Sequence, residues 1–457
     1  MKTSKNIFNR KAFAFLGAAA FMFAAVFIAG CKTEVSSSAP VPETFALTFK
    51  PGEHGSVDAK AGGKAVATGA KLEKGTTVEF TATPESGYEV DKWTVTGGEL
   101  VEGTGAEGST TAKVKVNGDV TVSVTFTHVY EPVSFSDLSN YLQNTASSTD
   151  VNKIEVQGLT AADLKGDAWD DASPLGKILK ANSDKKVALK FGGKIEGLTD
   201  MSYCFSGCKS LTQAPVIPTG VTNMYGCFHG CTNLTQAPAI PTGVTNMSYC
   251  FSDCTSLTQA PAIPTGVTNM YGCFSGCTSL TQAPAIPTGV TNMRSCFYDC
   301  TSLTQAPEIP AGVTDMSFCF LGCTSLTQAP AIPTGVTDME GCFSGCTSLT
   351  QAPEIPSGVT SMRDCFYGCT SLTQAPAIPT GVTNMRGCFR GCTKLESAVL
   401  KCNYNPAEIV GTLAFRNTFY GCTSLPAGGI KVPAAQLGTY RTNASVMGVP
   451  ADRFAAE

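Results

Sequence analysis

The residues of this 457-residue chain that are best equipped for chemistry are its 21 cysteines. Most of them occur in C-x3-C pairs, and nine such pairs follow one another every 23 residues, from Cys204 and Cys208 to Cys388 and Cys392. Thiols at this spacing have three uses: as zinc ligands, as halves of disulfides, or as small apolar side chains in a core. The compartment and the neighbours of each pair decide among these uses.

Disulfides are the use that the sequence favours. Structural zinc sites often include histidine, but among the three histidines only His229 lies near the pairs. In the last, irregular unit Thr418 replaces the first cysteine, and an additional Cys402 appears nearby, as pairing would require. The open alternative is a buried small side chain. The candidate disulfide cysteines are Cys204, Cys208, Cys227, Cys231, Cys250, Cys254, Cys273, Cys277, Cys296, Cys300, Cys319, Cys323, Cys342, Cys346, Cys365, Cys369, Cys388, Cys392, Cys402 and Cys422.

The amino terminus indicates the compartment. A basic start precedes an uncharged, mostly apolar run over residues 12–30, which is the order of a secretory signal. The sequence Ile-Ala-Gly-Cys that ends at Cys31 resembles the lipobox of bacterial lipoproteins, and the resemblance implies that Cys31 carries a membrane-attached lipid. The alternative is an uncleaved transmembrane anchor. We expect residues 1–30 to be the signal peptide, 31–43 a flexible tether, and the mature chain to be lipid-anchored at the outer-membrane cell surface.

Signatures of common catalytic centres are missing from the sequence. No P-loop, G-x-S-x-G, H-E-x-x-H or dinucleotide-binding fingerprint occurs. Acidic residues in the repeats stand singly on near-identical units, whereas a catalytic centre needs a unique constellation. The 32 basic and 36 acidic residues give no electrostatic reason to expect nucleic acid as a partner. We therefore expect no enzymatic activity, no cofactor and no metal.

The 23-residue unit dominates the sequence. Methionines from Met201 to Met385 each open M-x-x-C-F-x-(G/D)-C-(T/K)-x-L, and T-Q-A-P-x-I-P-x-G-V-T lies between them. A strict period with leucine in every unit indicates stacked coils of leucine-rich-repeat type. Over residues 194–425 the pattern resembles the BspA-like leucine-rich-repeat surface proteins. The resemblance implies a surface-exposed protein, and several members of that family are adhesins for extracellular-matrix or plasma glycoproteins.

Each column of the unit has an expected role. The leucines from Leu211 onward and the phenylalanines from Phe205 onward must stack into one core, because a single coil cannot bury itself. Gly220 and its equivalents are expected to turn the chain at positive φ. Pro215 and its equivalents fall where the family usually has uninterrupted strand, so we expect short, broken strands.

Three further segments surround the repeats. Residues 44–128 alternate like half-buried strands, with a tight hairpin expected at Asn117-Gly118. They resemble the divergent InlB B-repeat domains in P-G-E-H-G and in G-Y-x-V-x-x-W-x-V, which implies a small, β-grasp-like domain with Trp93 in its core. Residues 129–193 and 426–457 are expected to cap the coils. The predicted fold is mainly β with short helical turns: a leucine-rich-repeat solenoid of nine to ten units, preceded by an all-β domain and flanked by α/β caps.

Variation among the units points to one binding surface. The T-Q-A-P ladder barely changes, whereas the M-x-x-C-F-x-(G/D)-C segment, here called the tyrosine/arginine edge, varies in residues that are enriched at interface hot spots. The candidate binding residues are Tyr225, Tyr271, Arg294, Tyr298, Arg363, Tyr367, Arg386 and Arg390. We expect this edge to bind macromolecules of a host or neighbouring cell, such as extracellular-matrix or plasma glycoproteins. The rival hypothesis is a structural spacer or surface coat without a dedicated ligand.

Overall fold

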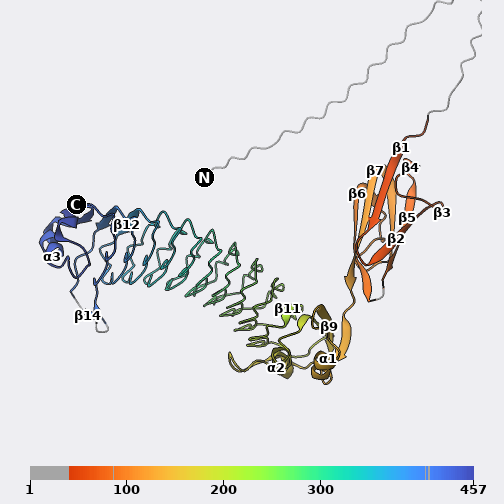
Figure 1. Cartoon of the computed structure of the whole chain (residues 1–457), viewed down its shortest axis with the longest axis horizontal. Coiled ribbons are helices and arrows are strands. Elements are labelled where there is room, and N and C mark those ends of the chain that lie inside the picture. Colours follow the sequence, from red (N-terminus) through yellow and green to blue (C-terminus); the bar gives the residue numbers. More distant parts are fainter. Residues whose placement is uncertain (1–40, 86, 407, 410–411) are drawn as a thin grey trace, which may run out of the picture. The chain divides into compact units, whose positions relative to one another are not determined.

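The computed structural model describes residues 41–457 except 86, 407, 410 and 411. The predicted signal peptide, Cys31 and most of the predicted tether lie outside the described residues. The chain divides into two compact units, Met1–Thr127 and His128–Glu457. Figure 1 shows strands in the first unit and a row of stacked coils in the second. In the described part, no helix combines the length and apolar character needed to cross a bilayer.

The first unit is one seven-stranded sheet in the order β3-β2-β5-β7-β1-β4, with β6 also paired to β7. Its strands are β1 (Thr44–Pro51), β2 (Gly55–Ala61), β3 (Lys64–Ala65), β4 (Ala70–Glu73), β5 (Thr77–Pro84), β6 (Tyr88–Leu100) and β7 (Thr111–His128). Alternate residues of β5 are buried, as its sequence predicts. Trp93 lies in the core as expected, and its indole nitrogen donates a hydrogen bond to the carbonyl of Ser109 at 2.7 Å.

The hairpin expected at Asn117-Gly118 is wrong, because both residues lie inside the single strand β7. The first part of β7 pairs with β5, from Thr111 to Lys115, and the second part pairs with β1, from Val120 to Val124. Each half thus has its own partner and need not fold back on the other. Neither Asn117 nor Gly118 adopts the positive φ that a two-residue hairpin turn requires.

The second unit begins with a parallel four-stranded sheet in the order β11-β10-β9-β8. Its elements are β8 (Glu131–Ser134), α1 (Leu138–Asn144), β9 (Val151–Gln157), η1 (Ala161–Leu164), α2 (Pro174–Ala181), β10 (Lys186–Gly192) and β11 (Leu211–Gln213). Helix α2 begins with proline after Ser173, whose side chain accepts a hydrogen bond from the backbone of Gly176 at 3.0 Å. Because β11 belongs to the first repeat, this sheet joins the preceding segment to the coils.

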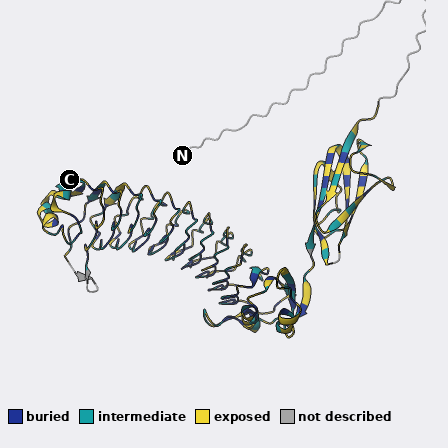
Figure 2. Cartoon of the chain, in the orientation of Figure 1, coloured by how far each residue is buried: buried dark blue, intermediate teal, exposed yellow. Residues whose placement is uncertain are grey.

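The coils stack through parallel pairing of residues 23 positions apart. Single bridges such as Asn223↔Asn246 and Gln305↔Gln328 connect successive coils between β11 and β12 (Gln374–Ile378). Prolines interrupt longer pairing, as expected from their missing backbone donor. The repeated methionine, cysteine, phenylalanine, leucine and valine side chains are buried, and Figure 2 shows this burial continuing from coil to coil. Each buried leucine, methionine or phenylalanine contributes roughly 1.5–3 kcal/mol.

Positive φ occurs at two other places in each coil, not at Gly220. These places are the second and sixth residues after the methionine, for example Gly226 and Gly230. A Cβ atom on Gly220 would instead lie 3.0 Å from the carbonyl oxygen of Leu198. The expectation of positive φ at Gly220 is therefore wrong. A side chain would be crowded at Gly220, but at most equivalents, such as Gly266, the nearest atom would lie at 3.5 Å, an ordinary contact.

A parallel four-stranded sheet in the order β12-β13-β16-β17 follows the regular coils. The elements of this end are β13 (Ser397–Leu400), β14 (Glu408–Ile409), β15 (Thr412–Leu413), β16 (Ile430–Val432), η2 (Ala434–Gln436), α3 (Leu437–Thr442), η3 (Ala451–Arg453) and β17 (Phe454–Ala456). Tyr440 of α3 is completely buried against this end, and its hydroxyl donates to the carbonyl of Cys402 at 3.0 Å.

Candidate binding surfaces on the stacked coils

The cysteine columns lie inside the coils as free thiols. All twenty cysteines from Cys204 to Cys422 are buried, and the described residues contain no disulfide. The second thiol of a pair donates a weak hydrogen bond to a phenylalanine carbonyl of the preceding coil; Cys231, for example, donates to Phe205 at 3.1 Å. The alternative of a small buried side chain therefore describes this structure, and the disulfide framework has no support in it.

Packing explains both Thr418 in a cysteine position and the additional Cys402, the two features from which a disulfide was predicted. Thr418 fills the vacant cysteine position and donates to the carbonyl of Phe415 at 2.7 Å. Cys402 lies elsewhere in the core, with its sulfur 3.9 Å from the sulfur of Met385 and 3.6 Å from the hydroxyl of Tyr440. Cys402 and Thr418 therefore pack against different residues of the core, and neither needs the other as a partner.

Burial also makes these thiols chemically inert. It raises the pKa of Cys319, Cys346 and Cys422 to about 12, because a buried site disfavours the thiolate. The thiolate is the form that attacks electrophiles and binds metals. Within the described ranges, no group of three or more histidine, cysteine, aspartate or glutamate side chains is arranged to hold a metal ion.

Aromatic side chains gather at the first coils of the tyrosine/arginine edge. Trp169, in the loop before α2, packs edge-on against Tyr203, His229 and Tyr249, with ring centroids 5.2, 4.4 and 4.8 Å away. The predicted binding residues Tyr225 and Tyr271 join the same cluster, each within 6.0 Å of Tyr249. These rings are half-buried because they fasten the loop to the coils. Sequence reasoning missed Trp169, although a tryptophan in a polar loop is itself a signal.

Electrostatics in this aromatic cluster favour neutral groups. Burial lowers the pKa of His229, despite Asp253 lying 3.7 Å from its Nδ1. Burial and the neighbouring Tyr225 raise the pKa of Tyr203 to about 12. The cluster is therefore uncharged near neutral pH and suits packing or hydrogen bonding rather than proton transfer.

The predicted arginines fall into two groups. Arg294 pairs with Asp315 at 3.7 Å, and Arg363 pairs with both Glu340 and Asp364, at 3.3 and 3.4 Å. In contrast, none of the ion pairs found among the described residues involves Arg386 or Arg390.

Exposed tyrosines flank Arg390. Its guanidinium lies 5.6 Å from the ring centre of Tyr367 and 5.3 Å from that of Tyr420. The sequence prediction included Tyr367 but missed Tyr420, because Tyr420 lies in the irregular last unit. The other predicted residue, Tyr298, is half-buried.

The T-Q-A-P ladder, which looked monotonous in sequence, contains hollows. One of about 350 Å³ is lined by Gln236, Gln259 and their neighbours, and an equivalent one of about 370 Å³ lies at Gln351 and Gln374. They form where small alanines lie between longer threonine and glutamine side chains. The alternation of small and long residues was the signal that sequence reasoning did not use.

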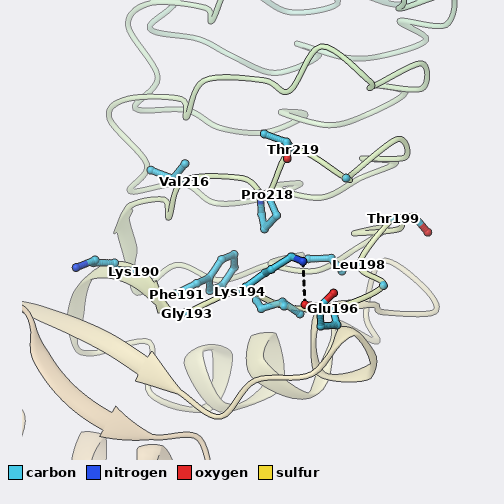
Figure 3. A pocket seen from close by; sticks show the side chains of 13 residues that line it. Lys190, Phe191, Gly193, Lys194, Glu196, Leu198, Thr199, Val216, Pro218 and Thr219 are labelled. Atoms are coloured by element: carbon cyan, nitrogen blue, oxygen red, sulfur yellow. Dashed lines mark ion pairs between the residues drawn. The ribbon is translucent and has the colours of Figure 1, made fainter.

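A further hollow of about 530 Å³ lies where β10 meets the first coil (Figure 3). Phe191, Leu198 and Pro218 give it an apolar lining, and Lys194 and Glu196 form an ion pair of 2.9 Å beside it. Val216, which replaces the alanine or glutamate of other units, is 83% exposed here. The lining is thus mainly apolar, with one charged pair beside it.

Stacked coils that share one core and expose variable edges define a leucine-rich-repeat scaffold. Family comparison agrees: residues 201–327 and 316–427 match the BspA type leucine rich repeat region, and residues 45–130 match the divergent InlB B-repeat domain. The chain therefore carries BspA-type leucine-rich repeats after a divergent InlB B-repeat domain. Both resemblances stated from the sequence are confirmed.

Solved structures of bacterial leucine-rich-repeat proteins are also similar to this chain. A leucine-rich repeat protein of T. pallidum is 19% identical, with 60% of this chain and 86% of that chain covered and a TM-score of 0.29. A leucine rich cell surface protein of Faecalibacterium prausnitzii is 22% identical, with 59% and 82% covered and a TM-score of 0.35. A leucine-rich repeat protein of Bacteroides ovatus is 20% identical, with 59% and 83% covered and a TM-score of 0.29. No curated protein matches the chain.

Proposed function

We propose that this chain is a lipid-anchored bacterial surface protein that binds macromolecular partners through the tyrosine/arginine edge of nine to ten stacked coils. One observation carries the proposal: Arg386 and Arg390 vary between units and have no ion-pair partner in the described part of the chain. Side chains that the fold does not use are available to a partner. The repeat family supports a protein-binding scaffold, and the signal and lipobox pattern support export and anchoring.

The rival function is a spacer or coat without a dedicated ligand. It is favoured by the near-identical ladder and by Arg294 and Arg363, whose charges are compensated within the coils. A coat needs only length and a continuous core. Binding experiments separate the two functions, because a coat shows no saturable ligand.

The first prediction concerns the replacement of four arginines by serine: Arg294, Arg363, Arg386 and Arg390. Purified full chain is tested against a panel of extracellular-matrix and plasma glycoproteins. The variant should bind the glycoprotein that the wild type recognises at least about tenfold more weakly, because hot-spot arginines are each worth about 1–2 kcal/mol.

A matched control replaces four ladder glutamines by alanine: Gln236, Gln259, Gln351 and Gln374. Its affinity should stay within about threefold of the wild type, since single exposed contacts outside a hot spot contribute little. Loss of binding in the ladder variant with unchanged affinity in the arginine variant would place the site at the ladder hollows. The absence of any saturable ligand would support the coat.

A further inference from the structure

We propose that the carboxy-terminal end of the tyrosine/arginine edge binds an anionic polysaccharide, a sugar chain that carries sulfate or carboxylate groups. The site consists of Arg386, Arg390 and Arg416, here called the arginine patch, with Tyr367 and Tyr420 beside it. This inference rests on the proposed function, since it assigns a ligand class to part of the same edge.

Backbone pairing brings the arginines of the patch together. The backbone nitrogen of Asp364 donates to the carbonyl of Arg386 at 2.8 Å, and that of Gly387 donates to the carbonyl of Arg416 at 2.9 Å. Arg386 and Arg416 therefore occupy equivalent positions in adjacent coils. Arg390 lies in the same turn as Arg386, four residues later. The rings of Phe389 and Phe419, which stack at 5.6 Å, show how closely these two coils approach.

One carboxylate lies at the border of the patch: an oxygen of Asp364 is beside Gly387, and its other oxygen pairs with Arg363. Glu340 and Asp364 both pair with Arg363, one coil before Arg386. No ion pair of the described residues reaches Arg386, Arg390 or Arg416. Three positive charges on two adjacent coils repel one another, and a bound anion would remove that repulsion. In a chain of net charge −4, this concentration of charge distinguishes the site from the rest of the edge.

Tyr367 and Tyr420 make the patch more suitable for a sugar than for a simple anion. They are 42% and 55% exposed and lie on either side of Arg390 along the row of coils. The cation–π contacts hold the guanidinium between two rings, while its N–H groups remain able to donate to sulfate or carboxylate oxygens. Exposed ring surface beside the guanidinium can pack against the C–H face of a sugar. Aromatic and cationic groups thus alternate from coil to coil, which fits a linear polymer that is both anionic and carbohydrate.

The test measures binding of full-length detergent-solubilised protein to heparin, hyaluronan and neutral dextran. Wild-type protein should bind heparin and hyaluronan with an affinity that falls as NaCl rises, and should not bind dextran. The variant R386Q/R390Q/R416Q should bind roughly tenfold or more weakly. The matched control K71Q/K115Q/K209Q removes the same charge at three exposed lysines outside the tyrosine/arginine edge and should stay within about threefold. If the triple variant and this control lose equal affinity, net charge accounts for binding and the site is overturned.

Two further measurements distinguish the ligand classes. Tyr367→Leu with Tyr420→Leu should weaken heparin binding about threefold or more. Poly-glutamate and a duplex DNA oligonucleotide should bind more weakly than heparin. If either binds as tightly and depends equally on the patch, the site serves an acidic protein or nucleic acid and the polysaccharide assignment fails.

Thermal unfolding is the control for folding of the triple variant. At low ionic strength R386Q/R390Q/R416Q should unfold at or above the wild-type temperature, because the repulsion between the three arginines has been removed. A loss of binding then cannot be ascribed to unfolding.

Failure of this inference is distinguishable from failure of the proposed function. If heparin and hyaluronan do not bind the wild type, the polysaccharide site is wrong. Glycoprotein binding that still depends on the edge arginines would leave the proposed function standing.

Discussion

The cysteines are the residues whose chemistry the fold changes most. In water a thiol is acidic enough to react near neutral pH, but in these coils Cys277 is fully buried and donates to the carbonyl of Phe251 at 3.1 Å. Folding therefore converts a reactive side chain into a small apolar one with a single weak hydrogen bond. A cysteine fits this position because it is larger than alanine, and its S–H can reach the carbonyl of the preceding coil.

The second prediction is the pH dependence that these thiols impose on stability. Burial raises the pKa of thiols such as Cys231 and Cys277 above the ordinary value of 9.0, so the unfolded chain releases protons above about pH 9 that the folded chain retains. The stabilisation is fully present below pH 9 and is lost as the pH rises, by about 1.4 kcal/mol per thiol and pH unit. Urea unfolding under reducing conditions should show a midpoint that is steady to about pH 8.5 and falls steeply above it.

The oxidation state decides whether this dependence appears in exported protein. Denatured protein from the exported fraction should release close to twenty free thiols from residues 204–422, and native protein should react far more slowly. A count near zero, with a midpoint that does not fall at high pH, would show that disulfides form after export and would restore the pairing predicted from Cys402.

At the scale of elements, the sequence predicts periodic features better than it predicts single turns. The 23-residue spacing and the Phe205 and Leu211 columns locate the core, because stacked coils must bury the same positions in every unit. The prolines of T-Q-A-P predict interrupted strands, because a missing N–H breaks pairing in any context.

What sequence reasoning could not predict depends on contacts between coils or strands. The chain adopts positive φ at positions such as Gly226 and not at Gly220, and Asn117 continues a strand because each half of β7 has its own partner. For the candidate site, residue types locate the tyrosines and arginines of this edge, and their role in binding stays a prediction. Only the structure shows that Arg363 is compensated and that Tyr420 lies over Arg390.

The third prediction is that one whole coil can be deleted without unfolding the protein. Deleting residues 316–338 removes one period and joins Asp315 to Met339, which restores the sequence of a normal junction. Neighbouring phenylalanines should stack again at the spacing now seen, 5.6 to 5.7 Å between Phe297, Phe320 and Phe343. We expect a folded protein with slightly lower stability, because one unit and one interface are lost. The affinity for heparin should stay within about threefold of the wild type, since the deletion leaves the arginine patch intact and removes few contacts with the ligand.

A half-period deletion is the control for register. Removing residues 316–327 places a ladder segment where the phenylalanine column belongs, so the core cannot be continuous. Circular dichroism and limited proteolysis should show loss of structure in this variant only. Equal behaviour of the two deletions would mean that the coils do not depend on the 23-residue register.

At the scale of the whole molecule, the proposed function assigns to the amino terminus the task of keeping the chain at the membrane. The apolar run over residues 12–30 is nearly as long as a bilayer-spanning helix, so its length is compatible with both a cleaved signal and a permanent anchor. The two anchors differ in chemistry. Lipidation requires the thiol of Cys31, whereas a transmembrane helix depends only on the apolar side chains.

The fourth prediction uses this difference. Cys31→Ala should abolish lipid attachment and release or mislocalise the chain, because the proposed anchor is the lipid on this thiol. Detergent-phase partition and labelling with a radioactive fatty acid measure the effect. Cys402→Ala is the matched control: it removes one thiol from the coil core, which should lower stability, but it leaves the lipobox intact and should retain the label. If the Cys31→Ala chain still enters the detergent phase with the membrane, its anchor is a transmembrane helix and the lipobox interpretation is wrong.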